Sequence, residues 1–475
     1  MAKLNNYNGR YCESEYESAF IAFLQSGGWT YLPGNKIKRC YRDVLIADDF
    51  RAFITKANTD LLEEEIEQIY DTVRLVGAES DFATLHKVYK WMVDGIQFTP
   101  QSGLPIQVTL IDFETPENNI FHVVNQLTVD YINNGQRENR RPDVLLYVNG
   151  MPLCIIELKN PADSHSTIYD AWEQITIRYW RDIPHLLHYC PLACISDGVK
   201  TRLGTVRTPY EHFYAWRRVN DADKISTMPF AETETMIKGV YAPERFLEIF
   251  RDYIYFQDEI FDCDEREIVC RYPQFFAARL LKQSIIKSVM EQTGKGGTYF
   301  GATGCGKTYT MAFLARQLSL RCTDIPGIGS PTIVMIVDRD ELQEQGIKLF
   351  AKSKEFLNLG EVSIVKSRNN LRQELGSRES GGFYICTIQK FCDRKEDKIG
   401  LINERHNIIC FSDEAHRTQL EHSRKIQFSK DADENMKAMV SKPYAKVLKE
   451  AFPHATFVGF TGTPIAELSL IHISE

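Results

Sequence analysis

One stretch constrains this chain more than any other: Gly301-Ala302-Thr303-Gly304-Cys305-Gly306-Lys307-Thr308. It fits the pattern G-x-x-x-x-G-K-[ST], in which glycines let the backbone turn so that consecutive N–H groups point at a polyphosphate. Residues 298–300 predict a short buried strand before it, and residues 310–318 predict an amphipathic helix after it. We therefore predict a nucleotide-binding loop in which Lys307 reaches the terminal phosphates and Thr308 holds Mg²⁺, on a backbone cradle formed by Gly301, Gly304 and Gly306.

Length and composition indicate a globular protein of two or three domains. The chain has 475 residues, of which 43% are hydrophobic and 25% are charged, and a single core rarely grows to that length. No apolar run approaches the roughly 20 residues that span a bilayer, and the polar residues 1–6 lack the apolar core of a signal peptide. We expect no membrane association and a cytoplasmic location. The twelve cysteines include no CxxC pair, which predicts reduced, mostly buried thiols.

The overall charge gives no support for nucleic-acid binding. The formal net charge is −8 and the pI is about 5.9, so any contact with nucleic acid requires a local basic patch. One candidate is the segment 36–42, which carries Lys36, Lys38, Arg39 and Arg42. The pattern favours a solvated face and leaves phosphate contact as the alternative.

A second informative stretch, residues 141–159, predicts a β-hairpin. Two apolar strands flank Asn149-Gly150, which is a strong turn signal. The apolar run 153–156 implies that the second strand is buried at the centre of a sheet. The end of such a strand is a place where a site can form.

Charged residues stand at the ends of both strands of this hairpin. Asp143 opens the first strand, and Glu157 and Lys159 close the second, two residues apart and therefore on one face. Two carboxylates and a lysine suit phosphodiester hydrolysis, because carboxylates hold Mg²⁺ and a lysine orients water or stabilises developing charge. The alternative is a hairpin whose three charges are simply solvated.

The turn decides whether Asp143 shares a face with the other two residues. A two-residue loop at Asn149-Gly150 pairs residues whose numbers sum to 299, which turns Asp143 away. A shared site therefore needs an odd-length loop or a bulge. We predict a three-residue loop, 148–150, with Gly150 in the left-handed conformation.

Strands and helices alternate through the second half of the chain. Helical stretches separate continuous apolar runs at 298–300, 332–337, 383–388, 408–411 and 456–460. All-apolar strands joined by helices predict a doubly wound parallel sheet, which binds ligands at the carboxyl ends of its strands.

Polar residues follow two of these apolar runs. After 408–411 comes Ser412-Asp413-Glu414-Ala415-His416, where we predict that Asp413 holds Mg²⁺ through water and Glu414 orients the attacking water. Thr461-Gly462-Thr463-Pro464 ends the last strand in the same way.

In their order along the chain, the loop 301–308, the segment 413–416 and the segment 461–464 resemble the motifs of superfamily 2 nucleic-acid motors. With Asp143, Glu157 and Lys159 upstream, nearly the whole chain resembles the restriction (motor) subunit of type I restriction–modification enzymes. Further matching stretches are Val337-Asp338-Arg339-Asp340-Glu341-Leu342, Thr387-Ile388-Gln389-Lys390-Phe391, Arg141-Pro142-Asp143 and Ile156-Glu157-Leu158-Lys159-Asn160-Pro161.

This resemblance implies a PD-(D/E)xK-type nuclease domain followed by a RecA-like motor lobe. The activity it implies is that of a type I site-specific deoxyribonuclease, an ATP-dependent DNA translocase-endonuclease that uses Mg²⁺. The implied partners are double-stranded DNA, a methyltransferase subunit and a sequence-specificity subunit.

The resemblance also assigns roles to residues. It implies nuclease roles for the Asp143, Glu157 and Lys159 set, and ATP binding and hydrolysis by Lys307, Thr308, Asp413 and Glu414. Gln274 is expected to contact adenine. The family usually has Gln-x₃-Tyr after the nuclease strand, whereas here Gln174 and Tyr179 are five residues apart, which leaves their role open.

We expect a nuclease domain with a helical connector at 1–260 and a first motor lobe at 261–467. Residues 468–475 do not resemble the family and are expected to be a non-native tail, with a second motor lobe absent. Two other functions fit the sequence: a stand-alone helicase-nuclease, and a nuclease-dead DNA-binding module that uses ATP as a switch. Metal-dependent DNA cutting separates the module from both enzymes, and co-purification with a methyltransferase separates the enzymes from each other.

Overall fold

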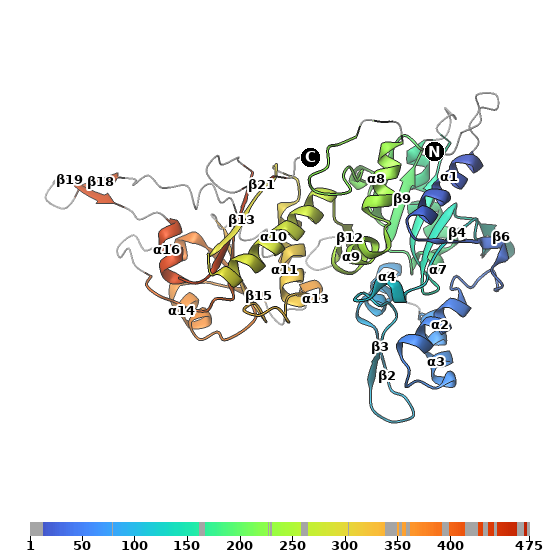
Figure 1. Cartoon of the computed structure of the whole chain (residues 1–475), viewed down its shortest axis with the longest axis horizontal. Coiled ribbons are helices and arrows are strands. Elements are labelled where there is room, and N and C mark those ends of the chain that lie inside the picture. Colours follow the sequence, from blue (N-terminus) through green and yellow to red (C-terminus); the bar gives the residue numbers. More distant parts are fainter. Residues whose placement is uncertain are drawn as a thin grey trace. The chain divides into compact units, whose positions relative to one another are not determined.

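The computed structural model divides into two compact units, residues 1–271 and 272–475, which are described separately (Figure 1). The residues described are 13–77, 79–160, 167–226, 228, 230–257, 265–302, 304–337, 349–350, 354–357, 362–391, 399–413, 426–430, 436–440, 444–462 and 470–472.

Unit 1 is built on a six-stranded mixed sheet of order β1-β4-β7-β8-β9-β10. The pairs β1–β4 and β8–β9 are parallel, and the other neighbours are antiparallel. The strands of this sheet are β1 (Thr30–Pro33), β4 (Phe121–Asn125), β7 (Val144–Val148), β8 (Met151–Leu158), β9 (Leu192–Ser196) and β10 (Thr201–Thr205). Every residue of β8 is buried, which confirms the predicted central strand.

Three two-stranded ribbons and a set of helices complete unit 1. The ribbons pair β2 (Ile96–Phe98) with β3 (Ile106–Val108), β5 (Val129–Asn133) with β6 (Gln136–Arg140), and β11 (Ile254–Gln257) with β12 (Arg266–Val269). The longer helices are α1 (Glu13–Ser26), α2 (Ala47–Ala57), α3 (Glu63–Arg74), α4 (Asp81–Asp94), α8 (Ala231–Gly239) and α9 (Pro243–Asp252). Shorter helical segments are η1 (Gly34–Lys36), η2 (Pro116–Asn118), α5 (Ile168–Glu173), η3 (Gln174–Tyr179), α6 (Trp180–Asp182), α7 (Pro184–Leu187) and η4 (Tyr210–His212).

The β7–β8 hairpin contains both a tight turn and a bulge. Val148 pairs with Met151 around a two-residue turn in which Asn149 and Gly150 both have positive φ, so the predicted three-residue loop is wrong. The register then shifts by one residue, and Leu146 pairs with Cys154. The bulge supplies the shift that the site required, because the extra residue turns the remainder of the strand over.

Asn149 fastens this turn to the rest of unit 1. Its side chain is fully buried, accepts a hydrogen bond from the Ile120 amide at 2.8 Å, and donates to the Leu110 carbonyl at 2.9 Å and Asn119 Oδ1 at 2.8 Å. Asparagine also tolerates the left-handed backbone, with φ of 50°. The residue therefore combines the conformation that the turn needs with a satisfied buried amide.

We expect Asn149→Ala to lower the unfolding free energy of unit 1 by about 3 kcal/mol, because buried donors and acceptors lose their partners at roughly 1–3 kcal/mol each. All five tryptophans lie in unit 1, so urea denaturation followed by tryptophan fluorescence reports this unit alone. Asn139→Ala, at an exposed position of β6, is the control and should change little. A loss below about 1 kcal/mol would show that the network contributes nothing beyond a single hydrogen bond.

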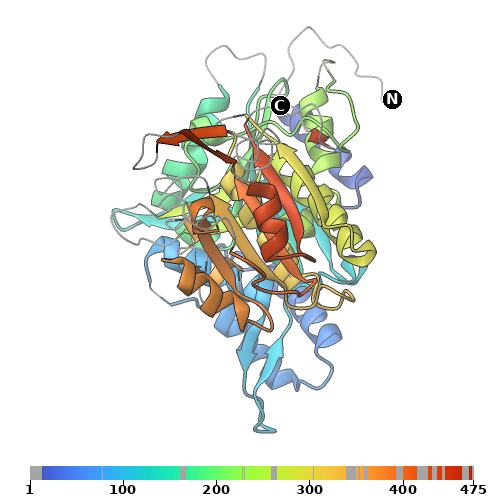
Figure 2. The same cartoon turned by 90° about the vertical axis from the view of Figure 1, so that its left-hand side faces the viewer.

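Unit 2 is a parallel sheet of order β15-β16-β14-β17-β20-β13-β21 (Figure 2). All of its neighbouring strands are parallel. The strands of unit 2 are β13 (Lys295–Phe300), β14 (Thr332–Val337), β15 (Val362–Ile364), β16 (Phe383–Thr387), β17 (Ile408–Asp413), β20 (Thr456–Thr461) and β21 (Leu470–His472), with a separate ribbon of β18 (Ile426–Lys430) and β19 (Met436–Val440). The helical segments are α10 (Tyr272–Glu291), α11 (Lys307–Leu320), α13 (Lys354–Leu357), α14 (Arg368–Gly376), η5 (Ile388–Lys390) and α16 (Tyr444–Ala451).

Buried side chains cover both faces of this sheet. Alternate residues of β14, Val334 and Ile336, pack into one cluster with Leu371 of α14 and Leu448 of α16. The residues between them are also buried, and α10 and α11 pack against each other, with α10 also against β13. The doubly wound α/β prediction is therefore confirmed, and all five predicted strands are present. β15 was not predicted, and β21 comes from the segment 468–475 that was left out of the fold prediction.

Two further expectations concern cysteines and membranes. The cysteines in the described ranges are free, and all except Cys40 are buried, as their spacing suggested. Among the described helices, none is long and apolar enough to cross a bilayer.

Candidate active sites

The shifted hairpin register brings Asp143 and Glu157 together. Val144 pairs with Ile156, so the residues just outside that pair, Asp143 and Glu157, stand opposite each other. The Asp143 amide approaches Glu157 Oε1 at 3.4 Å, and the Leu158 amide donates to Asp143 Oδ2 at 2.8 Å. The two carboxylates therefore share one end of β7 and β8, as the sequence required for a common site.

Lys159 joins them in a closed ring of side chains. Its Nζ lies 3.9 Å from Glu157 Oε2 and donates to Gln174 Oε1 at 2.9 Å. Gln174 Nε2 contacts the Tyr179 hydroxyl at 2.7 Å, and that hydroxyl donates to Glu157 Oε1 at 2.8 Å. Gln174 and Tyr179 thus fix the lysine amine and the glutamate carboxyl relative to each other.

A π-helical turn explains the unusual spacing of Gln174 and Tyr179. Residues 174–179 form η3, a π-helix between the α-helical turns α5 and α6. A π-helix bonds residue i to residue i+5, so residues five apart lie on one face, whereas in an α-helix that holds for residues three or four apart. The departure from Gln-x₃-Tyr is therefore compensated by the local backbone.

Without a bound cation, the environment of Glu157 disfavours the charged form of its carboxyl. Its side chain is fully buried, and burial first, then the charge of Asp143, raise the pKa of its carboxyl well above 4.5, against the opposing effect of Lys159. Glu157 Oε2 has no hydrogen-bond partner among the described residues. A buried acceptor without a donor is costly, and a cation at this position would relieve that cost.

The donor set fits a hard divalent cation held partly by water. Asp143 and Glu157 provide oxygen ligands, and within the described ranges no group of three or more His, Cys, Asp or Glu side chains is placed to hold a metal. Mg²⁺ is commonly bound through one or two carboxylates, with waters and substrate phosphate completing its shell. Two carboxylates are therefore sufficient for that ion.

Three polar residues beside the ring were not singled out from the sequence. Glu17 of α1 accepts hydrogen bonds from Asn125 at 2.6 Å and Gln126 at 2.8 Å, and Gln126 also donates to Asp143 Oδ1 at 3.2 Å. Gln126 holds a positive φ of 48°, which is unusual for a residue other than glycine. The sequence carried no signal for this link, because it joins α1 to the β4 end through tertiary contact alone.

In unit 2, the loop 301–308 leads from β13 into α11. Gly304 and Gly306 have φ of 85° and 81°, and Gly306 directly precedes α11, which begins at Lys307. Lys307 Nζ lies 3.5 Å from the Gly301 carbonyl, and Thr308 is half-buried. The described part of the loop has the strand–turn–helix context predicted for a phosphate cradle.

Gln274 of α10 contacts this loop directly. Its buried side chain donates to the Gly306 carbonyl at 3.2 Å and approaches the Cys305 carbonyl at 3.4 Å. A Cβ on Gly306 would come within 2.5 Å of Gln274 Nε2, so the close approach requires glycine there. Contact of Gln274 with adenine remains a prediction.

The carboxyl ends of three adjacent strands meet at the same edge. Phe300 of β13 pairs with Thr461 of β20, and Phe460 pairs with Asp413 of β17, while the Gly301 amide donates to the Thr461 carbonyl at 3.0 Å. Asp413 is half-exposed at this edge. Glu414 and the segments 338–342, 415–416 and 463–464 lie outside the described residues.

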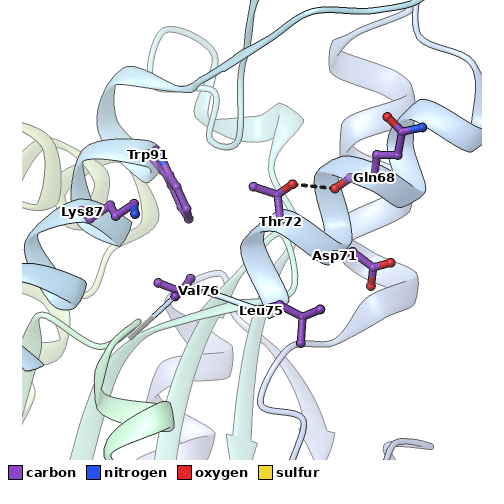
Figure 3. Close-up of a pocket in the computed structure, with 8 residues that line it drawn as sticks. Gln68, Asp71, Thr72, Leu75, Val76, Lys87 and Trp91 are labelled. Atoms are coloured by element: carbon purple, nitrogen blue, oxygen red, sulfur yellow. Dashed lines mark hydrogen bonds between the residues drawn. The ribbon is translucent and has the colours of Figure 1, made fainter. Parts of the chain in front are cut away.

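A cleft of about 600 Å³ lies elsewhere in unit 1, between α3 and α4 (Figure 3). Trp91 and Lys87 on α4 face Thr72 on α3 and Leu75, which directly follows α3, across it (Figure 3). It contains none of the residues of the side-chain ring, so it plays no part in the candidate site.

Comparisons with known proteins identify a family for each of the two units. Residues 10–212 match the family model "Type I restriction enzyme R protein N terminus", and residues 273–470 match "SWI2/SNF2 ATPase". The type I restriction enzyme HindI endonuclease subunit of Haemophilus influenzae is 31% identical over 472 residues, covering 96% of this chain and 43% of that protein. A protein provisionally named the MjaIXP endonuclease subunit, from Methanocaldococcus jannaschii, is 28% identical over 479 residues, covering 94% and 42%.

A solved structure of the Sulfolobus solfataricus SWI2/SNF2 ATPase core with double-stranded DNA is also similar, at 14% identity and a TM-score of 0.26, over 41% of this chain and 32% of that one. Because this TM-score is low, the family is assigned from the sequence matches alone. The chain spans less than half the length of the curated relatives named above. On those matches, the chain belongs to the family of type I restriction enzyme R (endonuclease) subunits, of which it carries the R-protein N-terminal region and the SWI2/SNF2 ATPase region.

Proposed function

We propose that this chain is part of an ATP-driven translocase that cleaves unmodified foreign double-stranded DNA. It would act in the cytoplasm, where that DNA and ATP are found, together with a methyltransferase subunit and a sequence-specificity subunit. The observation that carries the nuclease assignment is the ring of Asp143, Glu157, Lys159, Gln174 and Tyr179, in which a fully buried carboxylate oxygen has no hydrogen-bond donor among the described residues.

In this proposal the residues of unit 1 divide the work of phosphodiester hydrolysis. Asp143 and Glu157 would hold Mg²⁺, which when bound supplies Lewis-acid activation of the phosphate and of a water nucleophile. Lys159 stabilises the charge that develops on the phosphate oxygens. Gln174 and Tyr179 are positioning residues: they hold the Lys159 amine and the Glu157 carboxyl in place.

Unit 2 would bind and hydrolyse ATP at the carboxyl edge of its sheet. The cradle glycines and Lys307 bind the phosphates, Thr308 and Asp413 would hold the nucleotide's Mg²⁺, and Glu414 would orient the attacking water. Two observations support this assignment: the strand–loop–helix context of residues 295–320, and the position of Asp413 at the end of β17, which β20 separates from β13.

Lys159→Ala in the complex with the methyltransferase and specificity subunits should reduce DNA cleavage at least about 100-fold, the range seen when one stabilising donor is removed from an active site. ATP hydrolysis should remain within about twofold, because the lysine belongs to the other unit. Linearisation of a plasmid carrying one unmodified site measures cleavage, and phosphate release measures ATP use. Lys224→Ala, at an exposed position of unit 1, is the control; equal cleavage by both variants would remove Lys159 from the nuclease site.

A further inference from the structure

A basic surface lies beside the side-chain ring of unit 1 and is not explained by the chemistry assigned to that ring. It is formed by two segments, 34–43 and 129–141. Their cations outnumber their carboxylates seven to three: Lys36, Lys38, Arg39, Arg42, Arg137, Arg140 and Arg141 against Asp43, Asp130 and Glu138. In a chain of net charge −8, this is a local concentration of positive charge of the kind that nucleic-acid binding requires.

The two segments are joined by one backbone hydrogen bond and by the side chain of Arg39. The Asp130 amide donates to the Tyr41 carbonyl at 2.9 Å. Arg39 donates to the carbonyls of Thr128 and Asp43, each at 2.5 Å. Arg39 is therefore an anchor between the segments, which is neither of the two roles that the sequence left open for it.

The remaining cations of this surface divide into paired and unpaired groups. Arg137 pairs with Asp130, and Arg140 pairs with Asp182. Lys36, Lys38, Arg42 and Arg141 are exposed, and their side chains form no hydrogen bond or ion pair with another described residue. We call these four residues the basic ridge.

Two residues of the basic ridge, Arg141 and Lys36, are linked to the candidate nuclease site. Arg141 stands two residues before Asp143, at the end of the β5–β6 ribbon, which lies at the right-hand edge of unit 1 in Figure 1. Gly34, two residues before Lys36, packs so closely on the Asn125 carbonyl and the Leu127 backbone that a Cβ would clash with them. Asn125 in turn contacts Glu17 beside the ring.

The charge of Arg42 acts on a neighbouring side chain. Burial first, then the nearby charge of Arg42, lower the pKa of His185 to about 4, with smaller contributions from His188 and Arg39 and an opposing one from Asp43. The ribbon tip, residues 132–137, is exposed and carries no carboxylate. A polyanion approaching the tip itself would therefore meet no carboxylate of residues 132–137.

We propose that the basic ridge binds the phosphate backbone of the duplex beside the bond to be cut and so positions the DNA on the nuclease site. Four unpaired exposed cations on two rigidly joined segments can contact successive phosphates without reading bases, as backbone contacts do. This inference deepens the proposed function and depends on it for the identity of the bond that is cut, although DNA binding by the ridge can be measured separately.

The test measures binding of a DNA duplex to the full chain in EDTA without nucleotide. Fluorescence anisotropy of the duplex gives the binding constant at a range of salt concentrations. Lys36→Gln/Lys38→Gln/Arg42→Gln should weaken binding at least about tenfold and reduce the slope of log K against log salt by about 2–3, since each lost phosphate contact removes about 0.9. Arg141→Gln alone should reduce the slope by about 1.

The matched control removes three exposed cations elsewhere, as Arg217→Gln/Lys224→Gln/Lys287→Gln, and should leave the slope unchanged. Thermal melts of every variant establish that the fold is retained. An unchanged slope in the ridge variant, an equal fall in the control, or no duplex binding by the wild-type chain would overturn the inference. Mg²⁺-dependent cutting by the complex is scored separately: a ridge-dependent slope with no cutting leaves the ridge in place and refutes the nuclease function alone.

Discussion

Lys307→Ala should stop both ATP hydrolysis and site-dependent DNA cleavage in the assembled complex. The lysine is the only cationic side chain of the loop 301–308, and it begins α11 directly after the left-handed Gly306. Removing the donor to the β- and γ-phosphates should lower the hydrolysis rate at least about 100-fold. Cleavage should fall with it, because we propose that cutting follows translocation.

Two comparisons make this result specific. Lys295→Ala alters the exposed first residue of β13, at the opposite edge of the sheet from the loop, and should retain both activities. Lys159→Ala should retain ATP hydrolysis and lose cleavage, so the two lysine variants separate the two chemistries. Phosphate release and plasmid linearisation are measured on the same preparations. Intact site-dependent cutting by the Lys307 variant would mean that the nuclease does not depend on the motor.

The sequence predicted the parallel sheet of unit 2 well, because its signal is local. Runs such as 332–337 and 408–411 are continuously apolar. A strand with apolar residues on both faces must be covered on both faces, as the strands of a parallel sheet are. β15 escaped prediction because its three residues, Val362–Ile364, are only half-buried at the sheet edge. An edge strand this short carries little periodicity.

The nuclease site was predictable in its residues but not in its geometry. The spacing of Asp143, Glu157 and Lys159 indicated a shared face only if the numbers of the paired residues in the hairpin add up to an even number. The Asn-Gly turn predicted the opposite register, and a bulge restores it. Tyr147 pairs with Pro152 and Leu146 with Cys154, so Leu153 of β8 is the extra residue. A bulge depends on how the whole strand packs, so one sequence does not reveal it.

The same limit applies to residues that join the site from other elements. Gln174 and Tyr179 looked misplaced by α-helical spacing, and only the π-helical turn η3 brings both to the ring. Glu17 reaches the site through Asn125 and Gln126. These contacts arise from tertiary packing, which local patterns do not encode.

Glu157→Gln should make unit 1 more stable than the wild type in metal-free buffer at neutral and alkaline pH. In the unfolded chain the carboxyl titrates near 4.5, whereas burial, and then Asp143, raise its pKa in the folded protein. Between these two pKa values the folded state keeps a proton that the unfolded state has released. The carboxyl's contribution to the unfolding free energy therefore falls as pH rises, by about 1.4 kcal/mol per pH unit.

Glutamine does not titrate, so the advantage of the variant should grow with pH above about 4.5 and vanish below it. Urea denaturation in EDTA, followed by tryptophan fluorescence at several pH values, measures this difference in unit 1, which holds all five tryptophans. A variant that is less stable than the wild type throughout would show that Glu157 is charged in the metal-free protein and that its pairing with Lys159 is net stabilising.

Mg²⁺ should reverse the order of stability, and this is where the metal assignment is decided. A cation bound by Asp143 and the ionised Glu157 should stabilise the wild type by about 2.7 kcal/mol at a hundred times its Kd, and more strongly as pH rises because binding displaces a proton. Glu157→Gln should gain little stability from Mg²⁺.

Glu267→Gln is the matched control. Glu267 is another buried carboxyl of unit 1, and its pKa is likewise raised by burial. Both of its carboxylate oxygens lack hydrogen-bond partners among the described residues. It lies outside the ring, so its variant should gain metal-free stability yet keep the full response to Mg²⁺. An equal Mg²⁺ response in the Glu157 variant would place the metal elsewhere.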